Sequence, residues 1–184
     1  ETSSWSGEVG FRGPDGLQRT LDIDLLLHRT ADGVVEYWGG VARDITATKQ
    51  LQGELTRQAK HDHLTGLPNR LLLLRTAADA LEGIRSTRNN VAILFMDVDR
   101  LKDVNDTVGH EIGDALLAQV ANRISHATRP SDVVARIGGD EFVVLCDGNI
   151  DEHTAVDLAE RIRHSLSGRI MVHGVEVELS VSVG

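Results

Sequence analysis

The sequence predicts an α/β protein in which helices cover a mixed sheet, preceded by a small antiparallel sheet and a connecting helix. Three observations lead to this prediction. From His61 onward, helical periodicities alternate with apolar runs of strand length. The first 48 residues instead show short alternating runs that glycines interrupt. Between these two parts, residues 46–60 are polar and contain no proline, which favours a helix.

The N-terminal part is predicted to form an antiparallel meander. Alternating runs at 7–11, 21–25 and 34–38 are separated by Gly13-Pro14-Asp15-Gly16 and Ala31-Asp32-Gly33. Short strands joined by Asp-Gly turns are typical of hairpins. So small a sheet needs a cover for its apolar face, and too little sequence precedes it to supply one. We therefore expect this sheet to be the second half of a domain.

The polar segment that follows carries a narrow apolar seam. Leu51 and Leu55 lie four residues apart, with Ile45 and Ala59 in approximate phase. Such a seam favours a helix that pairs with a twin helix. A solvated linker helix explains the same short pattern equally well, so both interpretations stand.

The remainder of the chain alternates between helices and strands. Helical spacing of apolar residues occurs at 71–81, 112–124 and 155–166. The continuous apolar run at 91–96 predicts a strand buried on both faces. Further strands are predicted at 141–145 and in a hairpin of 170–172 with 175–183.

Composition limits the function. The 184 residues include 19 basic and 28 acidic side chains, a formal net charge of −9. Coating a nucleic acid needs a basic face, so no nucleic-acid partner is expected. A single cysteine, Cys146, excludes an internal disulfide and fits a reducing, cytoplasmic compartment.

The ends of the chain also carry information. No apolar run approaches the roughly 18 residues of a membrane helix, so no membrane segment is expected here, although a parent protein can be anchored elsewhere. The chain lacks an initiator Met and stops at Gly184, directly after a strand pattern. We expect both ends to lie within a longer protein.

A first candidate site lies at the end of the strand predicted at 91–96. Asp97 and Asp99 alternate onto the same face. Neighbouring carboxylates resist joint ionisation, and a divalent cation removes the penalty. Mg²⁺ is the usual choice where phosphates complete the coordination shell. The alternative interpretation is an ordinary solvated acidic turn.

A second acidic pair, Asp140 and Glu141, follows Gly138 and Gly139. Two glycines permit a tight turn with positive φ and let a ligand approach closely. If the two acidic strand ends are neighbours, Asp140 faces Asp97 and the carboxylates can form a metal-held triphosphate site. A plain hairpin turn is the alternative.

Further polar residues are candidates for binding a nucleotide. Asn105 and Asp114 can read a guanine edge by hydrogen bonding, or can simply begin a helix. Lys102 is a possible phosphate partner or a surface lysine. Arg129 and Asp132 lie shortly before the glycine pair. They can grip a phosphate or guanine edge, or form an exposed pair of no consequence.

Together these residues resemble the GGDEF family of diguanylate cyclases, over about residues 61–184. The motifs that carry the resemblance occur in the family's order: DHLTGLPNR at 62–70, DVDRLKDVND at 97–106, GHEIGD at 109–114, RIGGDEF at 136–142 and SVSVG at 180–184.

The resemblance implies an enzyme that joins two GTP into cyclic di-GMP and releases two pyrophosphates, with each subunit of a homodimer holding one GTP. It implies that Asp97, Asp140 and the Val98 carbonyl hold two Mg²⁺ or Mn²⁺. Glu141 would help to activate the 3′-hydroxyl, or would contact the metal and the ribose. The turn glycines Gly138 and Gly139 would approach the substrate.

The resemblance also implies roles for the more distant residues. Asn105 and Asp114 would read the guanine, and Lys102 would lie near the phosphates. Arg129 and Asp132 match the family's inhibitory site, where cyclic di-GMP binds and lowers activity.

Two departures from the family pattern matter. Leu101 stands where an aromatic residue usually precedes the lysine. The chain also stops where the family continues into a further strand and a C-terminal helical segment with basic residues that grip the triphosphate. We therefore expect this fragment to bind GTP weakly and to turn over poorly.

The N-terminal part resembles the C-terminal half of a PAS sensory domain, through WSGE at 5–8, the Asp15-Gly16 turn and GVARDIT at 40–46. The expected organisation is a partial PAS domain at 1–46, a helical linker at 47–60 and a GGDEF domain at 61–184 that lacks its C-terminal end. The PAS pocket lies mostly in sequence absent here, so haem, flavin and no ligand all stay open.

Two other functions remain as alternatives. A non-catalytic GGDEF receptor would bind GTP or cyclic di-GMP and regulate a neighbouring domain. The intact GGDEF sequence at 138–142 favours the enzyme, because receptors usually carry a damaged turn. A sensor with a coiled-coil dimerisation module would explain residues 1–60 but leave the carboxylates without a purpose.

Overall fold

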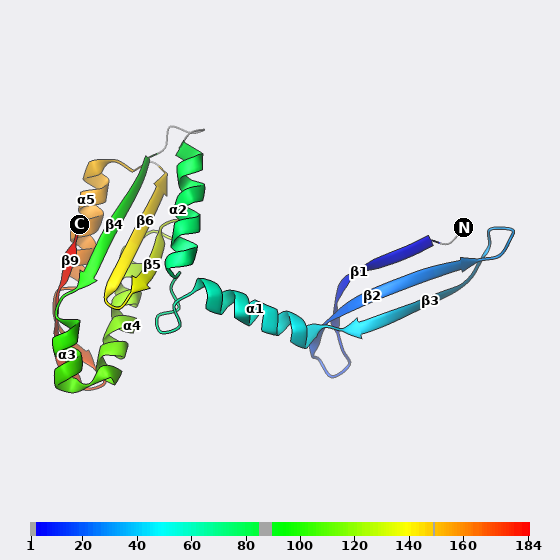
Figure 1. Ribbon diagram of the computed structural model, residues 1–184, viewed down its shortest axis with the longest axis horizontal. Helices are drawn as coiled ribbons and strands as arrows, with labels where there is room; N and C mark the ends of the chain where they lie inside the picture. Colours follow the sequence, from blue (N-terminus) through cyan, green and yellow to red (C-terminus); the bar gives the residue numbers. More distant parts are fainter. Residues whose placement is uncertain (1–2, 85–89, 149) are drawn as a thin grey trace. The chain divides into compact units, whose positions relative to one another are not determined.

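The computed structural model describes residues 3–84, 90–148 and 150–184, and the chain divides into two compact units at 1–57 and 58–184. Helix α1 (Thr46–Lys60) begins in the first unit and ends in the second (Figure 1). The two units are described separately below, because each is built around its own sheet.

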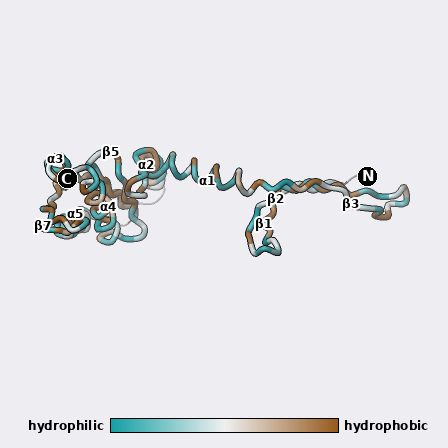
Figure 2. Tube along the Cα trace, turned by 90° about the horizontal axis from the view of Figure 1, so that it is seen from below, coloured by the Kyte–Doolittle hydropathy of each residue, from teal (hydrophilic) through white to brown (hydrophobic). Residues whose placement is uncertain are grey.

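The first unit is a three-stranded antiparallel sheet in the order β1-β2-β3, as the sequence predicts. Its strands are β1 (Ser3–Arg12), β2 (Gln18–Arg29) and β3 (Val35–Asp44). They are longer than the alternating runs indicate, since pairing continues up to the tight turns. The tube of β2 and β3 alternates between hydrophobic and hydrophilic residues (Figure 2). Trp5 and Trp38 are 46% and 61% exposed within the described residues.

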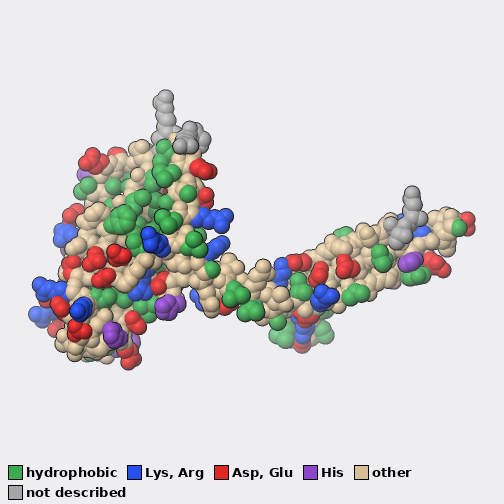
Figure 3. All heavy atoms as spheres, in the orientation of Figure 1, with side chains coloured by type: hydrophobic (Ala, Val, Ile, Leu, Met, Phe, Trp, Pro, Cys, Tyr) green, Lys and Arg blue, Asp and Glu red, His purple; other side chains and the backbone are tan. Residues whose placement is uncertain are grey.

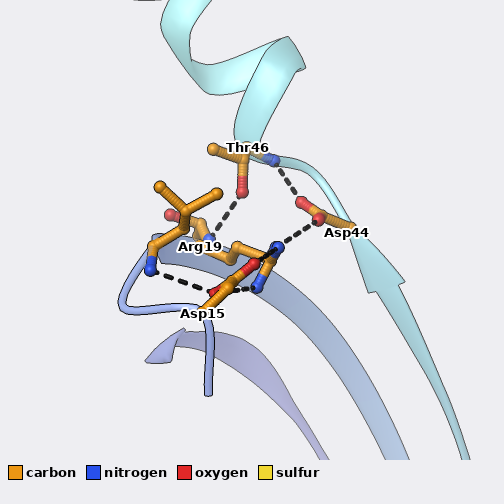
Figure 4. A network of polar contacts seen from close by, with 6 residues as sticks. Asp15, Arg19, Asp44 and Thr46 are labelled. Carbon is orange, nitrogen blue, oxygen red and sulfur yellow. Dashed lines mark hydrogen bonds and ion pairs between the residues drawn. The ribbon is translucent and has the colours of Figure 1, made fainter. Parts of the chain in front are cut away.

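A polar network fastens this sheet to the start of α1 (Figure 4). Asp44 Oδ1 accepts a hydrogen bond from Thr46 N at 2.9 Å, and Thr46 Oγ1 accepts one from Thr20 N at 2.8 Å. The hydrogen bonds from Thr46 hold the pKa of the Asp44 carboxyl below its ordinary value. Arg19 joins the carboxylates of Asp15 and Asp44. Helix α1 therefore begins at Thr46, directly after the strand.

The second unit contains the rest of the secondary structure. Its elements in chain order are α2 (Arg70–Ile84), β4 (Asn90–Val98), α3 (Leu101–Val108), α4 (His110–Ala127), β5 (Val133–Gly138), β6 (Glu141–Gly148), α5 (Glu152–Ser165), β7 (Gly168–Val172), β8 (Val175–Leu179) and β9 (Val181–Val183). The main sheet has the order β5-β6-β4-β9, and β7 and β8 form a separate hairpin.

Helices cover both faces of the main sheet. On one face, Leu116 and Ile124 of α4 and Ile162 of α5 are buried together with Met96 and Phe142 of the sheet. On the other face, α2 places Leu73 against a smaller cluster on β5 and β6, formed by Ala135, Val143 and Leu145. The predicted α/β class with covering helices is confirmed.

Some finer expectations are wrong. Each strand pairing described in the main sheet is antiparallel, so the sheet is not mixed. The strand predicted at 91–96 is not buried on both faces, because Ile93 and Phe95 are 45% and 57% exposed within the described residues. The predicted strand at 175–183 is interrupted at Ser180. The Ser180 carbonyl accepts a hydrogen bond from Asp99 N at 3.1 Å, and the chain leaves the hairpin there to pair with β4 as β9.

Asn69 connects the end of α1 to the start of α2. Its Nδ2 donates to Ala59 O at 2.9 Å, and its backbone N donates to Lys60 O at 2.9 Å. Its Oδ1 accepts from Leu72 N at 3.1 Å, which is the geometry of a helix N-cap. One side chain thus ends one helix and begins the next.

No helix in the described ranges is both long enough and apolar enough to cross a membrane.

Candidate functional site

Two acidic strand ends lie side by side in the main sheet. Asp97 near the end of β4 pairs with Glu141 at the start of β6, and Val98 N donates to Asp140 O at 3.1 Å. Because the strands are antiparallel neighbours, the end of one meets the beginning of the other. The structure therefore brings Asp97 and Asp140 together, as the strand ends predict. On this face of the unit, acidic side chains gather beside hydrophobic ones (Figure 3).

The carboxylates at this edge interact electrostatically. Burial, and then the charges of Asp140, Asp99 and Glu141, raise the pKa of Asp97. Asp99 also accepts a hydrogen bond from Ser182 Oγ at 2.8 Å, which ties β9 to the site. The arrangement concentrates negative charge, and a bound cation would relieve the repulsion.

The turn between β5 and β6 differs from the sequence expectation in its backbone. Gly138 pairs with Glu141, which leaves Gly139 and Asp140 as the turn. Neither glycine adopts the positive φ that we expected. The space beside Gly139 is open, since a Cβ built there meets nothing within 4 Å, whereas a Cβ on Gly138 would lie 3.2 Å from Glu141 Oε2. The turn is therefore open toward a ligand.

The expected guanine-reading residues lie at the junction of α3 and α4. Asn105 on α3 touches Gly113 on α4 so closely that a Cβ on Gly113 would overlap Asn105 Oδ1. Asp114 follows Gly113 and is exposed. Within the described part of the chain, Asn105 Oδ1 is buried without a hydrogen-bond partner. An unpaired buried acceptor is costly, and this one is enclosed against Gly113 of α4.

Lys102 lies exposed in the first turn of α3. A cavity of about 750 Å³ reaches the carboxylates but follows a different face of the same helix, at Asp103, Val104 and Thr107. Lys102, Asn105 and Asp114 do not line this cavity. The structure thus brings the carboxylates and the turn glycines together. Asn105 contacts Gly113, the residue before Asp114, and these residues form a separate group.

Arg129 and Asp132 line a smaller cavity, of about 210 Å³, together with Cys146 and Arg161. Arg129 N donates to Asp132 Oδ2 at 2.8 Å. Burial, followed by the Asp132 charge, raises the pKa of the Cys146 thiol to about 11. Cys146 is therefore a buried thiol rather than a nucleophile, in agreement with its place in the core.

The residues that are expected to hold a metal ion have side-chain and backbone groups of a suitable chemical kind. In the ranges that the structure describes, no three Asp, Glu, His or Cys side chains form a metal-binding group. The expected set is different, because it combines the carboxylates of Asp97 and Asp140 with the Val98 carbonyl. All three donors are oxygens, which hard divalent cations prefer, and the crowding of carboxylates around Asp97 favours a cation.

Sequence reasoning missed three contributors to this region. Ser182 orients Asp99, Gly113 makes room for Asn105, and the Arg136 side chain donates to the Gly139 carbonyl. Ser182, Gly113 and Arg136 all stand inside the motifs quoted above, so their positions carried a signal. Their contacts did not, because no local pattern marks which distant residue each one meets.

Comparisons with known proteins give a consistent result. Residues 59–184 match the family described as diguanylate cyclase, GGDEF domain. The chain is 38% identical over 151 residues to the diguanylate cyclase TpbB of Pseudomonas aeruginosa, covering 82% of this chain and 33% of that protein. It is 40% identical over 139 residues to the bifunctional diguanylate cyclase/cyclic di-GMP phosphodiesterase MucR of the same organism, covering 76% of this chain and 20% of that protein. The chain thus spans a third or less of the length of these relatives.

Solved structures agree. The GGDEF domain of TpbB superposes with a TM-score of 0.65 at 40% identity, covering 67% of this chain and 73% of that one. A sensory box/GGDEF family protein from Caulobacter crescentus gives a TM-score of 0.65 at 36% identity, covering 68% and 81%. The two acidic strand ends, the open glycine turn and these matches lead to one conclusion: the chain belongs to the GGDEF family of diguanylate cyclases.

Proposed function

We propose that this chain contributes the catalytic domain of a diguanylate cyclase, which condenses two GTP into cyclic di-GMP and releases two pyrophosphates. One observation carries the proposal. Asp97 lies close to Asp140, and Asp140 belongs to an intact Gly-Gly-Asp-Glu-Phe sequence. The similarity to TpbB, which is named a diguanylate cyclase, supports it.

In the proposed reaction, the 3′-hydroxyl of each GTP attacks the α-phosphate of the other. Two phosphodiester bonds form, two α–β anhydride bonds break, and each hydroxyl loses its proton. Glu141, beside Asp97 in the strand register, is the candidate to assist that proton transfer. Each domain holds one GTP, so a homodimer is needed to align the two nucleotides for in-line attack.

Asp97, Asp140 and the Val98 carbonyl are proposed to hold two Mg²⁺, for which Mn²⁺ can substitute. When bound, these ions would polarise the α-phosphate and stabilise charge on the attacking and leaving oxygens. The protein's own part is to hold the carboxylates in place, and the open space beside Gly139 would let the triphosphate approach the turn that Gly138 begins.

Guanine selection is assigned to Asn105 and Asp114, and phosphate contact to Lys102. The contact between Asn105 on α3 and Gly113 on α4 supports the first assignment, because it brings Asn105 to the residue next to Asp114. Selection of a base by hydrogen bonds is sharp, since a base without the matching groups leaves polar atoms unpaired.

For the N-terminal residues we propose the C-terminal part of a PAS sensory domain at 1–46, followed by a helical linker at 47–60 and the GGDEF domain from residue 61. The antiparallel sheet and the Asp44–Thr46 hydrogen bond at the start of α1 support this organisation. A reaction that consumes GTP, in a chain with one free thiol, belongs in the cytoplasm.

The test is product analysis after incubation with GTP and Mg²⁺, using both the 184-residue chain and the longest chain that its gene encodes. Cyclic di-GMP should form and should disappear when the metal is chelated. A folded dimer that binds GTP but forms no product would exclude the cyclase and favour the receptor alternative.

Product feedback is proposed to act through Arg129 and Asp132, which line the cavity of about 210 Å³. Arg129→Ala should relieve inhibition by added cyclic di-GMP while the initial rate stays unchanged, because the residue lies away from the carboxylates. Initial rates at increasing product concentration measure this. An inhibition curve like that of the native chain would reduce Arg129 and Asp132 to a surface pair.

A further inference from the structure

Arg136 makes several hydrogen bonds around the glycine turn. Its Nε and Nη2 both donate to the Gly139 carbonyl, at 3.1 and 2.7 Å. Its Nη1 donates to Asp62 Oδ1 at 2.9 Å. Its backbone N donates to the Pro68 carbonyl at 3.0 Å. The side chain therefore joins the turn to the segment that follows α1.

The contact is well sheltered. The side chains of Arg136 and Asp62 are 11% and 17% exposed. A planar guanidinium that donates in two directions has little rotational freedom, and a lysine cannot reproduce that geometry. Arg136 is therefore suited to fix the position of a peptide group rather than merely to neutralise a charge.

Asp62 is itself held in place. Its Oδ1 accepts from Thr65 N at 2.9 Å and from Thr65 Oγ1 at 2.7 Å, in addition to Arg136. The backbone of the same loop closes on itself, since Asp62 N donates to Leu67 O at 2.8 Å. Asp62 is a fixed anchor for the guanidinium.

The turn needs such support. Gly139 has no side chain to pack, and a Cβ there would meet no neighbour within 4 Å. The carbonyl that Arg136 grips belongs to the peptide group immediately before Asp140. The carbonyl of Asp140 itself accepts from Val98 N at 3.1 Å. The backbone on both sides of Asp140 is thus tied down, once by β4 and once by Arg136.

We propose that Arg136, anchored by Asp62, is the positioning residue that orients the Gly139–Asp140 peptide and so sets Asp140 against Asp97. This rests on the proposed function, since it assigns Arg136 an effect on the rate of that reaction. Arg136 itself touches neither carboxylate of the pair, and it acts through the backbone of the turn.

The experiment compares Arg136→Ala, Arg136→Lys, Asp62→Ala and the double variant Asp62→Ala/Arg136→Ala in the form of the chain that makes product. Arg136→Ala should lower kcat about tenfold or more with KM for GTP within about threefold, because misplacing a catalytic group slows the reaction more than it weakens binding. Arg136→Lys should recover part of the loss. The double variant should be no slower than Arg136→Ala, because both single changes break one connection.

The matched control is Arg123→Ala. Arg123 also donates from a partly buried side chain to a backbone carbonyl, that of Ser165 at 2.9 Å, but away from the turn. It should leave kcat unchanged. Amide resonances of Gly139, Asp140 and Glu141 should shift in Arg136→Ala and not in Arg123→Ala, whether or not product forms.

The outcomes separate the inference from the function on which it rests. If the native chain makes no cyclic di-GMP, the proposed function fails, and the amide resonances alone decide the inference. If the native chain is active, a kcat for Arg136→Ala equal to that of the Arg123→Ala control overturns the inference. If the fold-losses in kcat of the two single variants multiply in the double variant, the two residues act independently, and the anchoring of Arg136 by Asp62 is overturned.

Discussion

At the scale of single residues, the site is a concentration of like charges that the fold imposes. Asp97 pairs with Glu141 across two strands, and Asp140 and Asp99 lie close enough to raise the pKa of Asp97 further after burial has done so. Such an arrangement weakens the isolated protein, since like charges destabilise the folded state. A bound cation would remove this repulsion.

Asp140→Ala should abolish formation of cyclic di-GMP and leave the fold intact. The expected loss is at least about a hundredfold, because a ligand to the ions that stabilise the transition state is removed. Product formation and circular dichroism measure the two effects. Asp79→Ala, which removes an exposed carboxylate from α2, is the control and should retain full activity. If Asp140→Ala kept its activity and its metal requirement, Asp140 would not belong to the site.

Asp62 should make stability depend on pH in the acidic range. Burial raises its pKa, but the hydrogen bonds from Thr65 and the Arg136 guanidinium outweigh burial and hold the pKa below the ordinary 3.8. A carboxyl with a depressed folded pKa adds stability above its unfolded pKa, and that stability is lost as pH falls through the folded value.

Asp62→Asn should therefore lower the free energy of unfolding by about 1–2 kcal/mol at pH 7, since it weakens hydrogen bonds to a charged group. The difference from the native chain should shrink steadily below about pH 4. Urea unfolding across pH 3–7 measures it. A difference that stays constant with pH would mean that the charge of Asp62 does not contribute.

At the scale of elements, the junction of α3 and α4 depends on one small residue. Gly113→Ala would push a methyl group into Asn105 Oδ1, so α3 and α4 must separate. We expect about 1–3 kcal/mol of destabilisation from overpacking and a reduced preference for GTP over ATP. Unfolding and nucleotide competition measure the two effects. Gly83→Ala in α2, where a Cβ meets nothing within 4 Å, is the control. Equal effects of the two variants would contradict the role of Gly113.

The sequence predicts some of these elements better than others. In α4, Leu116, Val120 and Ile124 recur at helical spacing and are all buried, so the pattern and the packing coincide. In α3, Leu101, Val104 and Val108 stand at helical spacing, and Leu101 and Val104 contact the core, but eight residues are too short a run for this pattern to establish a helix. The alternation at 175–183 includes β9, but it does not show that the chain breaks at Ser180 and changes its strand partner.

The sequence likewise predicts some contacts of the candidate site and not others. The proximity of Asp97 and Asp140 could be predicted only on the condition that their two strands are neighbours, because β4 and β6 are separated in the chain by α3, α4 and β5. The bond between Arg136 and Asp62 joins residues 74 positions apart, and nothing local in either segment indicates it. Contacts of this kind depend on the assembled fold.

At the scale of the whole molecule, the two units differ in how they are stabilised. The buried clusters around α4, α5 and the main sheet draw all their residues from the second unit. The first unit is a single sheet in which Leu27 is buried but several large apolar side chains, such as Trp5 and Trp38, are exposed in the described residues. The second unit therefore has the core needed to fold alone.

A chain that begins at residue 58 should retain the unfolding midpoint of the second unit in the 184-residue chain. The core clusters stay complete, and Ala59 and Lys60 remain to accept the bonds from Asn69. Thermal unfolding followed by circular dichroism compares the two. A marked loss of stability would show that residues 1–57 support the second unit.

The bonds from Asn69 have a consequence for how such proteins diversify. The last turn of α1 is closed from its C-terminal side, at the carbonyls of Ala59 and Lys60, and so its ending does not depend on which residues lie upstream. Any helix that arrives in the correct rotational phase can be terminated in the same way. Gene fusion can therefore exchange the segment that precedes this last turn while the GGDEF domain keeps its own junction.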